Sequence, residues 1–364
     1  MDLFHCKRRL KFWHESRGKS SYMRFRNEMY EMCSVHPSIL ALEWYLSFFK
    51  KCMSTLSSER FDIFAKMTNQ SPPLVIYALD FDGVLVDSAA ETGQSGLAAA
   101  KILFPGKQWI HELDNDSEQR HAVIKRFCMV RPCLETGWEA ALLIKLLADP
   151  EEGLPTNEEI LNTFQSRQKS RLMETLGLSK ETCNDALRKV RNEWIERNNA
   201  QDWIDAHGFF EGGCDAVKEI LSDPKVRENV YVITTKAKDY AKRLMEQRGL
   251  YATDDSKIID SHIYGLGSGP KAQVLSSIMK ERQADIAVMV EDNLKTLEKI
   301  MNSDIQEKTL PVLACWGYNT ANQQEVATEN HYVTLSNTDS SSLSKVLSDS
   351  FVLTAFQEFQ LTRK

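Results

Sequence analysis

The sequence has no apolar stretch long enough to cross a membrane, which takes about 20 residues in a helix. The best candidate, residues 39–49, is short and contains Glu43. Near the start, Arg8, Arg9 and Lys11 lead into no continuous apolar segment, so no secretory signal peptide is expected. We therefore expect a protein without a membrane partner.

Paired cysteines are also missing. The sequence has 8 cysteines, and no two of them form a CxxC pair or lie beside a cluster of histidines. They are Cys6, Cys33, Cys52, Cys128, Cys133, Cys183, Cys214 and Cys315. A zinc site and a disulfide framework are therefore not expected. Scattered free thiols are typical of a reducing compartment such as the cytoplasm.

No strong excess of either charge is present. The 45 Lys and Arg residues against 51 Asp and Glu residues leave a net charge of −6. This balance gives no general attraction to nucleic acid or anionic membranes, so neither is an expected partner. The 364 residues, 42% of them hydrophobic, can bury a sizeable core and suit two domains or one core with a large insert. We expect a monomer.

Residues 1–70 differ from the rest of the chain. They begin with a basic, acid-poor segment, and residues 36–51 follow with a helical pattern. One interpretation is a partly helical, solvated extension of a cytoplasmic protein. Another is a targeting segment of residues 1–66 that leads to a chloroplast or mitochondrion. A third places the natural translation start at Met53 or Met67. A Ser-Pro-Pro stretch separates the extension from the remainder of the chain.

Continuous apolar runs of strand length then alternate with helical patterns. The runs cover residues 74–79, 230–233, 286–290 and 310–316, with a weaker one at 258–264. The helical patterns cover residues 216–222, 237–248, 272–281 and 294–301. Strands that are buried on both faces and separated by helices predict a Rossmann-like, three-layer α/β fold with a parallel sheet.

A long segment between the first two runs has no strand pattern. Five helical patterns occupy it, at residues 89–103, 117–130, 136–147, 157–175 and 179–198. A helical insert after the first strand, with the sheet resuming later, is a cap domain by its arrangement. We therefore predict a core of residues 71–88 and 207–364 and an all-α cap of residues 89–206.

The strongest chemical signal lies where the first predicted strand ends. Asp80 and Asp82 follow this strand, and Gly83 allows a sharp turn behind them. Ligands of open α/β sheets bind at the carboxyl ends of the strands. Because successive strand residues face opposite sides, the chain must turn after Asp80 for both carboxylates to reach one ligand. A chance acidic turn after a strand is the plain alternative.

Three later segments carry polar or charged groups at the end of a strand or the start of a helix. Thr234 and Thr235 follow the second strand, and Lys271 opens a helix where its ammonium can lie beside an anion. Glu291 and Asp292 end a third strand, and such a pair is costly unless a cation neutralises it. Oxygen ligands of this kind select Mg²⁺. Taken singly, a threonine at a strand end or a surface lysine would indicate nothing.

The strand that ends in Asp80-Phe-Asp-Gly83 resembles the first motif of the haloacid dehalogenase (HAD) superfamily. The three later segments resemble its other motifs, in the family's order, so the resemblance covers about residues 74–335. It implies that Asp80 attacks phosphorus and forms an aspartyl-phosphate. It also implies that Asp82 protonates the leaving oxygen and then deprotonates the hydrolytic water.

The same resemblance implies the ligand contacts. The phosphoryl group would be bound by Thr234, Thr235, Lys271 and the turn at Gly83. The Mg²⁺ ion would be held by Asp80, by Asp82 through its backbone carbonyl, by Asp292 and, as a helper, by Glu291. Many members have a further acid four residues after the aspartate, where this sequence has Thr296. The metal geometry is therefore expected to depart from the common pattern.

Residues 131–137, 234–236, 264–271 and 316–320 further resemble a little-characterised plant and algal HAD subgroup with a helical cap. Arg131 and Glu135 lie in the part of the cap where such caps often choose substrates. Arg131 could bind a second anionic group of the substrate, or form a structural ion pair within the cap.

The resemblance implies a Mg²⁺-dependent phosphatase that acts on a small phosphorylated metabolite. A phosphomutase of the same superfamily shares the core and the aspartate pair, and a HAD-like scaffold or regulator shares the fold alone. A scaffold would not need the five groups that match the family motifs, which argues against this alternative. They are Asp80, Asp82, Thr234, Lys271 and Asp292. A separation of more than about 10 Å between Asp80 and Asp292 would exclude the predicted metal site, because Mg²⁺ needs its oxygen ligands near 2.1 Å.

Overall fold

The computed structural model describes residues 73–252, 257–336 and 340–363, which belong to a compact unit that begins at Pro73. The predictions for residues 1–70 lie outside the described residues, as do Cys6, Cys33 and Cys52. The other five cysteines are free thiols. Within the described ranges, no helix is long and apolar enough to cross a membrane.

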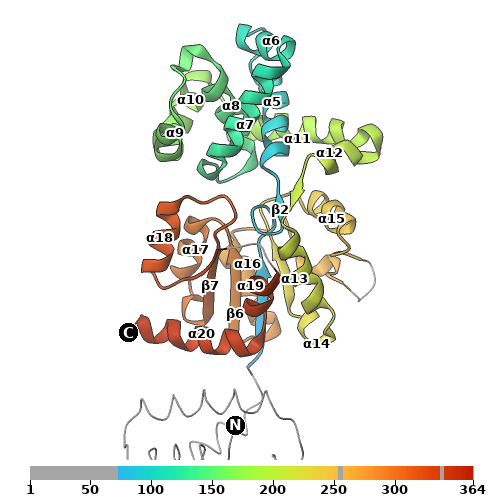
Figure 1. Cartoon of the computed structure of the whole chain (residues 1–364), viewed down its shortest axis with the longest axis vertical. Coiled ribbons are helices and arrows are strands. Elements are labelled where there is room, and N and C mark those ends of the chain that lie inside the picture. Colours follow the sequence, from blue (N-terminus) through green and yellow to red (C-terminus); the bar gives the residue numbers. More distant parts are fainter. Residues whose placement is uncertain (1–72, 253–256, 337–339, 364) are drawn as a thin grey trace, which may run out of the picture. The chain divides into compact units, whose positions relative to one another are not determined.

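The core contains a six-stranded parallel sheet with the strand order β5-β4-β1-β6-β7-β8. Figure 1 labels two of its strands, β6 and β7, beside the helices that flank the sheet. The strands are β1 (Val75–Leu79), β4 (Val230–Ile233), β5 (Ile263–Tyr264), β6 (Ile286–Glu291), β7 (Thr309–Ala314) and β8 (Val333–Leu335). β1 lies between β4 and β6, and its last residue, Leu79, pairs with Val232 on one side and Val290 on the other. The carboxyl ends of these three strands therefore meet at one edge.

Helices cover both faces of this sheet. On β1, Val75, Tyr77 and Leu79 belong to one hydrophobic cluster, and Ile76 and Ala78 belong to the other. The first cluster includes residues of α13 (Glu211–Leu221), α15 (Lys238–Gln247), α19 (Ser340–Val346) and α20 (Asp349–Thr362). The second includes residues of α16 (Lys271–Arg282), α17 (Leu294–Met301) and α18 (Ala321–Glu329). The predicted three-layer α/β fold is confirmed.

The segment after β1 is helical, as predicted. It contains α5 (Ala89–Leu103), α6 (Gln108–Asn115), α7 (Ser117–Val130), α8 (Ala140–Ala148), α9 (Asn157–Thr163), α10 (Lys169–Leu176), α11 (Lys180–Glu196) and α12 (Gln201–Asp205). A π-helical segment at Phe164–Gln168 divides the single helix predicted for residues 157–175. Buried side chains from Leu97 to Val190 form a hydrophobic cluster of their own, without any strand residue of the sheet.

Several short elements were not predicted. Two of them, β2 (Val86–Asp87) and β3 (Gly208–Phe209), pair antiparallel where the chain passes between core and cap. α14 (Pro224–Arg227), α6, α12, α18 and β8 were missed as well. Two-residue strands show no period in a sequence, so only their pairing reveals them.

In the core, the predicted boundaries of two strands and one helix were wrong by two residues or more. β7 ends at Ala314 rather than at residue 316, because the Gly317 N–H donates to the Ala314 carbonyl and turns the chain. β5 begins only at Ile263, because residues 260–262 form a 3₁₀ turn. α13 begins at Glu211 rather than at residue 216, although two glycines weaken its first turn.

Candidate active site

The turn after β1 places Asp80 and Asp82 at the carboxyl edge of the sheet. The Asp80 N–H donates to the Val290 carbonyl of β6, which continues the β1–β6 pairing. The chain then turns back on itself, with the Gly83 N–H donating to the Val86 carbonyl at 2.8 Å. Gly83 has a φ of +88°, a conformation that residues with a Cβ rarely adopt. This is the turn that the sequence required.

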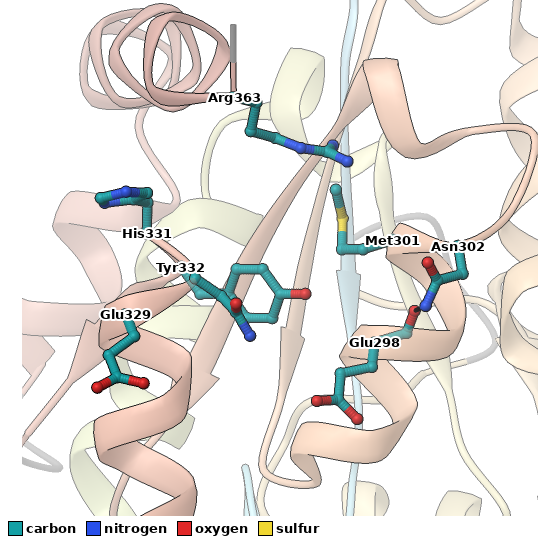
Figure 2. A pocket seen from close by; sticks show the side chains of 8 residues that line it. Glu298, Met301, Asn302, Glu329, His331, Tyr332 and Arg363 are labelled. Carbon is teal, nitrogen blue, oxygen red and sulfur yellow. Dashed lines mark hydrogen bonds between the residues drawn. The ribbon is translucent and has the colours of Figure 1, made fainter.

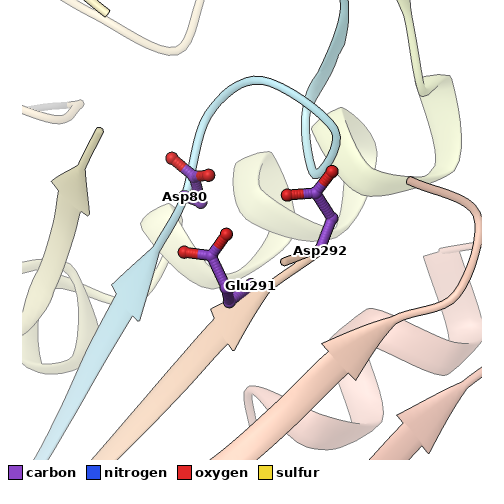
Figure 3. Close-up of side chains that lie close together, drawn as sticks. All are labelled: Asp80, Glu291 and Asp292. Carbon is purple, nitrogen blue, oxygen red and sulfur yellow. The ribbon is translucent and has the colours of Figure 1, made fainter. Parts of the chain in front are cut away.

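Three buried carboxylates meet at this edge. One oxygen from each of Asp80, Glu291 and Asp292 lies within 4.8 Å of the other two. Figure 3 shows the side chains of Asp80, from the end of β1, and of Glu291 and Asp292, from the end of β6, gathered together. The separation is therefore well below the distance that would have excluded the predicted metal site.

Lys271 is the first residue of α16 and carries a single positive charge into this acidic cluster. Its Nζ lies 2.7 Å from Asp80 Oδ1 and 2.7 Å from Glu291 Oε2. Burial would lower the pKa of Lys271, but Asp80 and then Glu291 raise it well above its usual range. Lys271 is therefore positively charged and forms ion pairs with two of the three acids.

One ammonium does not neutralise three carboxylates. Burial, and then Glu291, raise the pKa of Asp80 to about 7 against the pull of Lys271. Burial, and then Asp80, raise the pKa of Asp292 to about 6. Burial also raises the pKa of Glu291. The raised pKa values mean that these three buried carboxylates have too little positive charge beside them. A hard divalent cation would supply that charge and let all three carboxylates ionise.

Two glycines leave room for Asp292. A Cβ on Gly83 would stand 1.9 Å from Asp292 Oδ2, and a Cβ on Gly317 would stand 2.3 Å from Asp292 Cβ. The loop after β7 also holds this aspartate directly, because the Tyr318 N–H donates to Asp292 Oδ2 at 2.7 Å. The Trp316 indole N–H donates to the Val84 carbonyl and ties the same loop to the turn after β1. Gly317 was missed because only the fold brings it to Asp292.

The loop after β4 carries Thr234, Thr235 and Lys236. Thr234 is buried, and its Oγ1 accepts a hydrogen bond from the Lys236 N–H, whereas Thr235 is exposed. The Lys236 Nζ donates to Asp82 Oδ1 at 3.0 Å. Burial would raise the pKa of Asp82, but Lys236 lowers it below its usual range. The structure therefore gives Asp82 a cationic partner that sequence reasoning did not assign to it.

Both cap residues singled out in the sequence contact the core. The Arg131 guanidinium lies 4.3 Å from the centre of the Tyr318 ring, and Glu135 forms an ion pair of 3.3 Å with Lys295 of α17. Arg131 is buried and donates to the Leu134 carbonyl, but its Nε has no hydrogen-bond partner among the described residues. No carboxylate of these residues pairs with it. The expected alternative of an ion pair within the cap is therefore not found there.

Thr296 stands in the first turn of α17, where its N–H donates to the Asn293 side chain. It is not part of the acidic cluster. Thr296, which departs from the family pattern, thus helps to begin a helix. Asp80, Glu291 and Asp292 lie together without an acid at its position.

A pocket of about 440 Å³ lies elsewhere on the core (Figure 2). It is lined by Glu298, Met301, Asn302, Glu329, Asn330, His331, Tyr332 and Arg363. These residues come from the end of α17, the segment before β8 and the end of α20, and none of them was predicted as a site residue. The candidate site is the acidic cluster rather than this pocket.

Fold and site together define a capped α/β protein with a buried acidic centre at the carboxyl edge of its sheet. The described residues form a parallel α/β core with a helical insert after β1, the arrangement that the resemblance of the motifs implied. Asp80, Thr234 and Asp292 each follow a strand of the sheet or end it, and Lys271 opens a helix beside them.

No family model matches the chain, and no curated protein matches it. Solved structures resemble it at the level of the fold. A protein of Lactobacillus delbrueckii subsp. bulgaricus, provisionally named a phosphoglycolate phosphatase, is 13% identical with a TM-score of 0.47, over 76% of this chain and 98% of that one. A haloacid dehalogenase-like hydrolase of Streptococcus pneumoniae is 16% identical with a TM-score of 0.40, over 79% and 100% of the two chains. Likeness at this level says nothing of activity.

Proposed function

We propose that the protein is a Mg²⁺-dependent phosphatase that hydrolyses a small phosphomonoester through an aspartyl-phosphate. The observation that carries the proposal is the buried cluster of Asp80, Glu291 and Asp292 with Lys271 at the carboxyl edge of the sheet. Bound there, Mg²⁺ would be held by these acids and the Asp82 carbonyl, and would offset the charge of the carboxylates and of the phosphoryl oxygens.

The protein's own groups divide the reaction into two steps. In the first, an Asp80 oxygen attacks phosphorus, the bond to the leaving oxygen breaks, and Asp82 protonates that oxygen. In the second, Asp82 takes a proton from a water molecule that attacks the phosphorus, which frees phosphate and Asp80. Thr234 and Lys271 hold the phosphoryl oxygens, and Lys271 keeps Asp80 aimed by its 2.7 Å contact.

Arg131 favours a substrate with a second anionic group. It is a buried cation from the cap that has no carboxylate partner among the described residues and lies against Tyr318, which itself donates to Asp292. A carboxylate or second phosphate near the scissile phosphate would complete its hydrogen bonds. The small-molecule partner, the monomeric state and the cytoplasmic location remain predictions.

The test is turnover of p-nitrophenyl phosphate with Mg²⁺ and with EDTA, in the wild type, in Asp292→Asn and in Asp304→Asn. Asp304 is a matched control because its carboxylate is exposed and pairs with Lys280 outside the cluster. We expect Mg²⁺-dependent turnover in the wild type and the control, and a loss of at least 100-fold in Asp292→Asn. Absence of turnover on this ester and on sugar phosphates, nucleotides and phosphoglycolate would instead favour a mutase or a scaffold.

A further inference from the structure

Tyr318, in the loop after β7, contacts the acidic cluster and the entrance to the cap at the same time. Its backbone N–H donates to Asp292 Oδ2 at 2.7 Å. Its hydroxyl accepts a hydrogen bond of 2.6 Å from the Ser88 N–H and donates one of 2.9 Å to Asp87 Oδ1. Asp87 and Ser88 directly precede α5, the first helix of the cap. Tyr318 therefore ties a proposed metal ligand to the point where the chain enters the cap.

These contacts fix the Tyr318 ring at both of its ends. Asp292 anchors the backbone, and Asp87 and Ser88 anchor the hydroxyl. Burial raises the pKa of the hydroxyl well above its usual range, so the phenol keeps the proton that it donates to Asp87. Because the ring cannot turn away without breaking these hydrogen bonds, it presents a fixed flat face.

Arg131, the residue after α7, brings a positive charge from the cap onto this face. Its guanidinium lies 4.3 Å from the ring centre, a distance at which an aromatic face attracts a cation. Its Nη1 donates to the nearby Leu134 carbonyl at 3.3 Å, and its buried Nε has no hydrogen-bond partner among the described residues. A guanidinium has five N–H groups, so donors remain for a ligand. The Tyr318 ring thus fixes the plane in which these donors point.

We propose that Tyr318 is a positioning residue for substrate selection, whose ring holds the Arg131 guanidinium where it binds the second anionic group of a substrate. The backbone of the same residue holds Asp292, so Tyr318 also sets how far this second site lies from the metal site. A planar guanidinium held in one orientation matches the paired oxygens of a carboxylate. The inference rests on the proposed function, because the role of Arg131 is part of it.

The test measures binding, which does not depend on turnover. Propylphosphonate and 3-phosphonopropionate are nearly equal in size, and only the second has a carboxylate. Neither can be hydrolysed as an ester, because the phosphorus is bonded to carbon. Calorimetry on the full-length protein with Mg²⁺ gives a Kd for each compound, and the ratio of the two Kd values measures the preference for a second anion. We expect the wild type to bind 3-phosphonopropionate about 100-fold more tightly.

Two substitutions separate the ring from the hydroxyl. Tyr318→Leu removes the ring face under Arg131, so the preference should fall below about 10-fold. Tyr318→Phe keeps the ring and loses only the hydroxyl, so it should keep most of the preference. A wild type without the preference, an unchanged preference in Tyr318→Leu, or an equal loss in Tyr318→Phe would overturn the inference.

A double variant tests whether Tyr318 acts through Arg131. Arg131→Leu should itself abolish the preference, and adding Tyr318→Leu should then cause no further loss, because the two residues act as one unit. A preference that survives in Arg131→Leu, or a further loss in the double variant, would contradict the proposed role.

Tyr332→Leu is the matched control. Tyr332 is also partly buried and its ring packs against Phe359, but it precedes β8 and so lies at the opposite edge of the sheet from the acidic cluster. Its loss should lower the melting temperature and leave the ratio of the two Kd values unchanged; a fall like that in Tyr318→Leu would overturn the inference. If the wild type hydrolyses no phosphate ester, the proposed function fails, and the ratio still decides whether Tyr318 positions Arg131.

Discussion

At the scale of single residues, the site depends on two glycines, because each leaves space that a Cβ atom would fill. Gly83 and Gly317 both face Asp292 at distances that no Cβ tolerates. The acidic cluster is therefore held by packing as well as by charge. A small change in this packing should weaken metal binding before it lowers the stability of the fold.

Gly83→Ala tests this packing. A Cβ at Gly83 would collide with Asp292 Oδ2, so we expect a loss of Mg²⁺-dependent turnover of at least 100-fold and weaker Mg²⁺ binding by calorimetry. Gly106→Ala separates the collision from backbone strain, because Gly106 also has a positive φ, +75°, with nothing near its Cβ position. That control should cost about 1 kcal/mol of stability and keep its activity. Equal losses in both variants would contradict the account.

Arg131 offers a prediction about specificity. Arg131→Leu removes the buried cation that faces the site from the cap, so KM for phosphoglycolate or another substrate with two anionic groups should rise by about 10- to 100-fold. KM for p-nitrophenyl phosphate should change less than about 3-fold, since that ester has no second anion. Arg188→Leu, at an exposed cap position, is the control. A uniform rise for both kinds of substrate would mean that Arg131 only packs the cap.

Individual site residues could be predicted where a strand end marked them. Asp80 and Asp292 follow or lie beside long apolar runs, and parallel strands bring such ends to one edge. The partners of these residues could not be predicted. Asp82 was marked by its strand end, but its partner Lys236 lies far from it in the sequence, and only the fold brings the two together.

At the scale of elements, length decided what could be predicted. β1 and β6 are five and six residues long and fully buried, so their apolar runs stood out. β2 and β3 have two residues each, too few to show any period. These short strands mark the passages between core and cap. These passages were therefore the part of the fold that could not be predicted from the sequence.

The cap has its own hydrophobic cluster, so we predict that a substitution there destabilises the cap without destabilising the core. Leu142 of α8 is 0% exposed at the centre of that cluster, so Leu142→Ala should cost about 2–5 kcal/mol. Hydrogen exchange should accelerate across α5, α7 and α8, while the amides of β1 and β6 keep their protection. Equal acceleration in the sheet would show that cap and core unfold as one unit.

At the scale of the whole molecule, the acidic cluster links stability to metal and pH. Without metal, Asp80 and Asp292 have pKa values of about 7 and about 6, raised by burial above the value near 4 of an unfolded chain. The folded state therefore holds more protons, so this stability is complete below about pH 4 and is lost as the pH rises toward 7. Bound Mg²⁺ removes the loss, because it favours the ionised acids.

The expected result is a melting temperature that Mg²⁺ raises more at pH 8 than at pH 5, measured against EDTA at each pH. Asp292→Asn should flatten this difference, since it removes one of the raised carboxylates and a metal ligand. A Mg²⁺ effect that is the same at both pH values would contradict the assignment of the cluster as a cation site.

The most direct test of the central claim is to trap the covalent intermediate on Asp80. The protein is mixed with p-nitrophenyl phosphate and Mg²⁺, quenched in acid within the first turnover, digested and analysed by mass spectrometry. We predict one added phosphoryl group on the peptide that contains Asp80, and none in Asp80→Asn, which should also lose turnover by at least about 1,000-fold. Turnover without a phosphorylated Asp80 peptide, or turnover that survives in Asp80→Asn, would contradict the account.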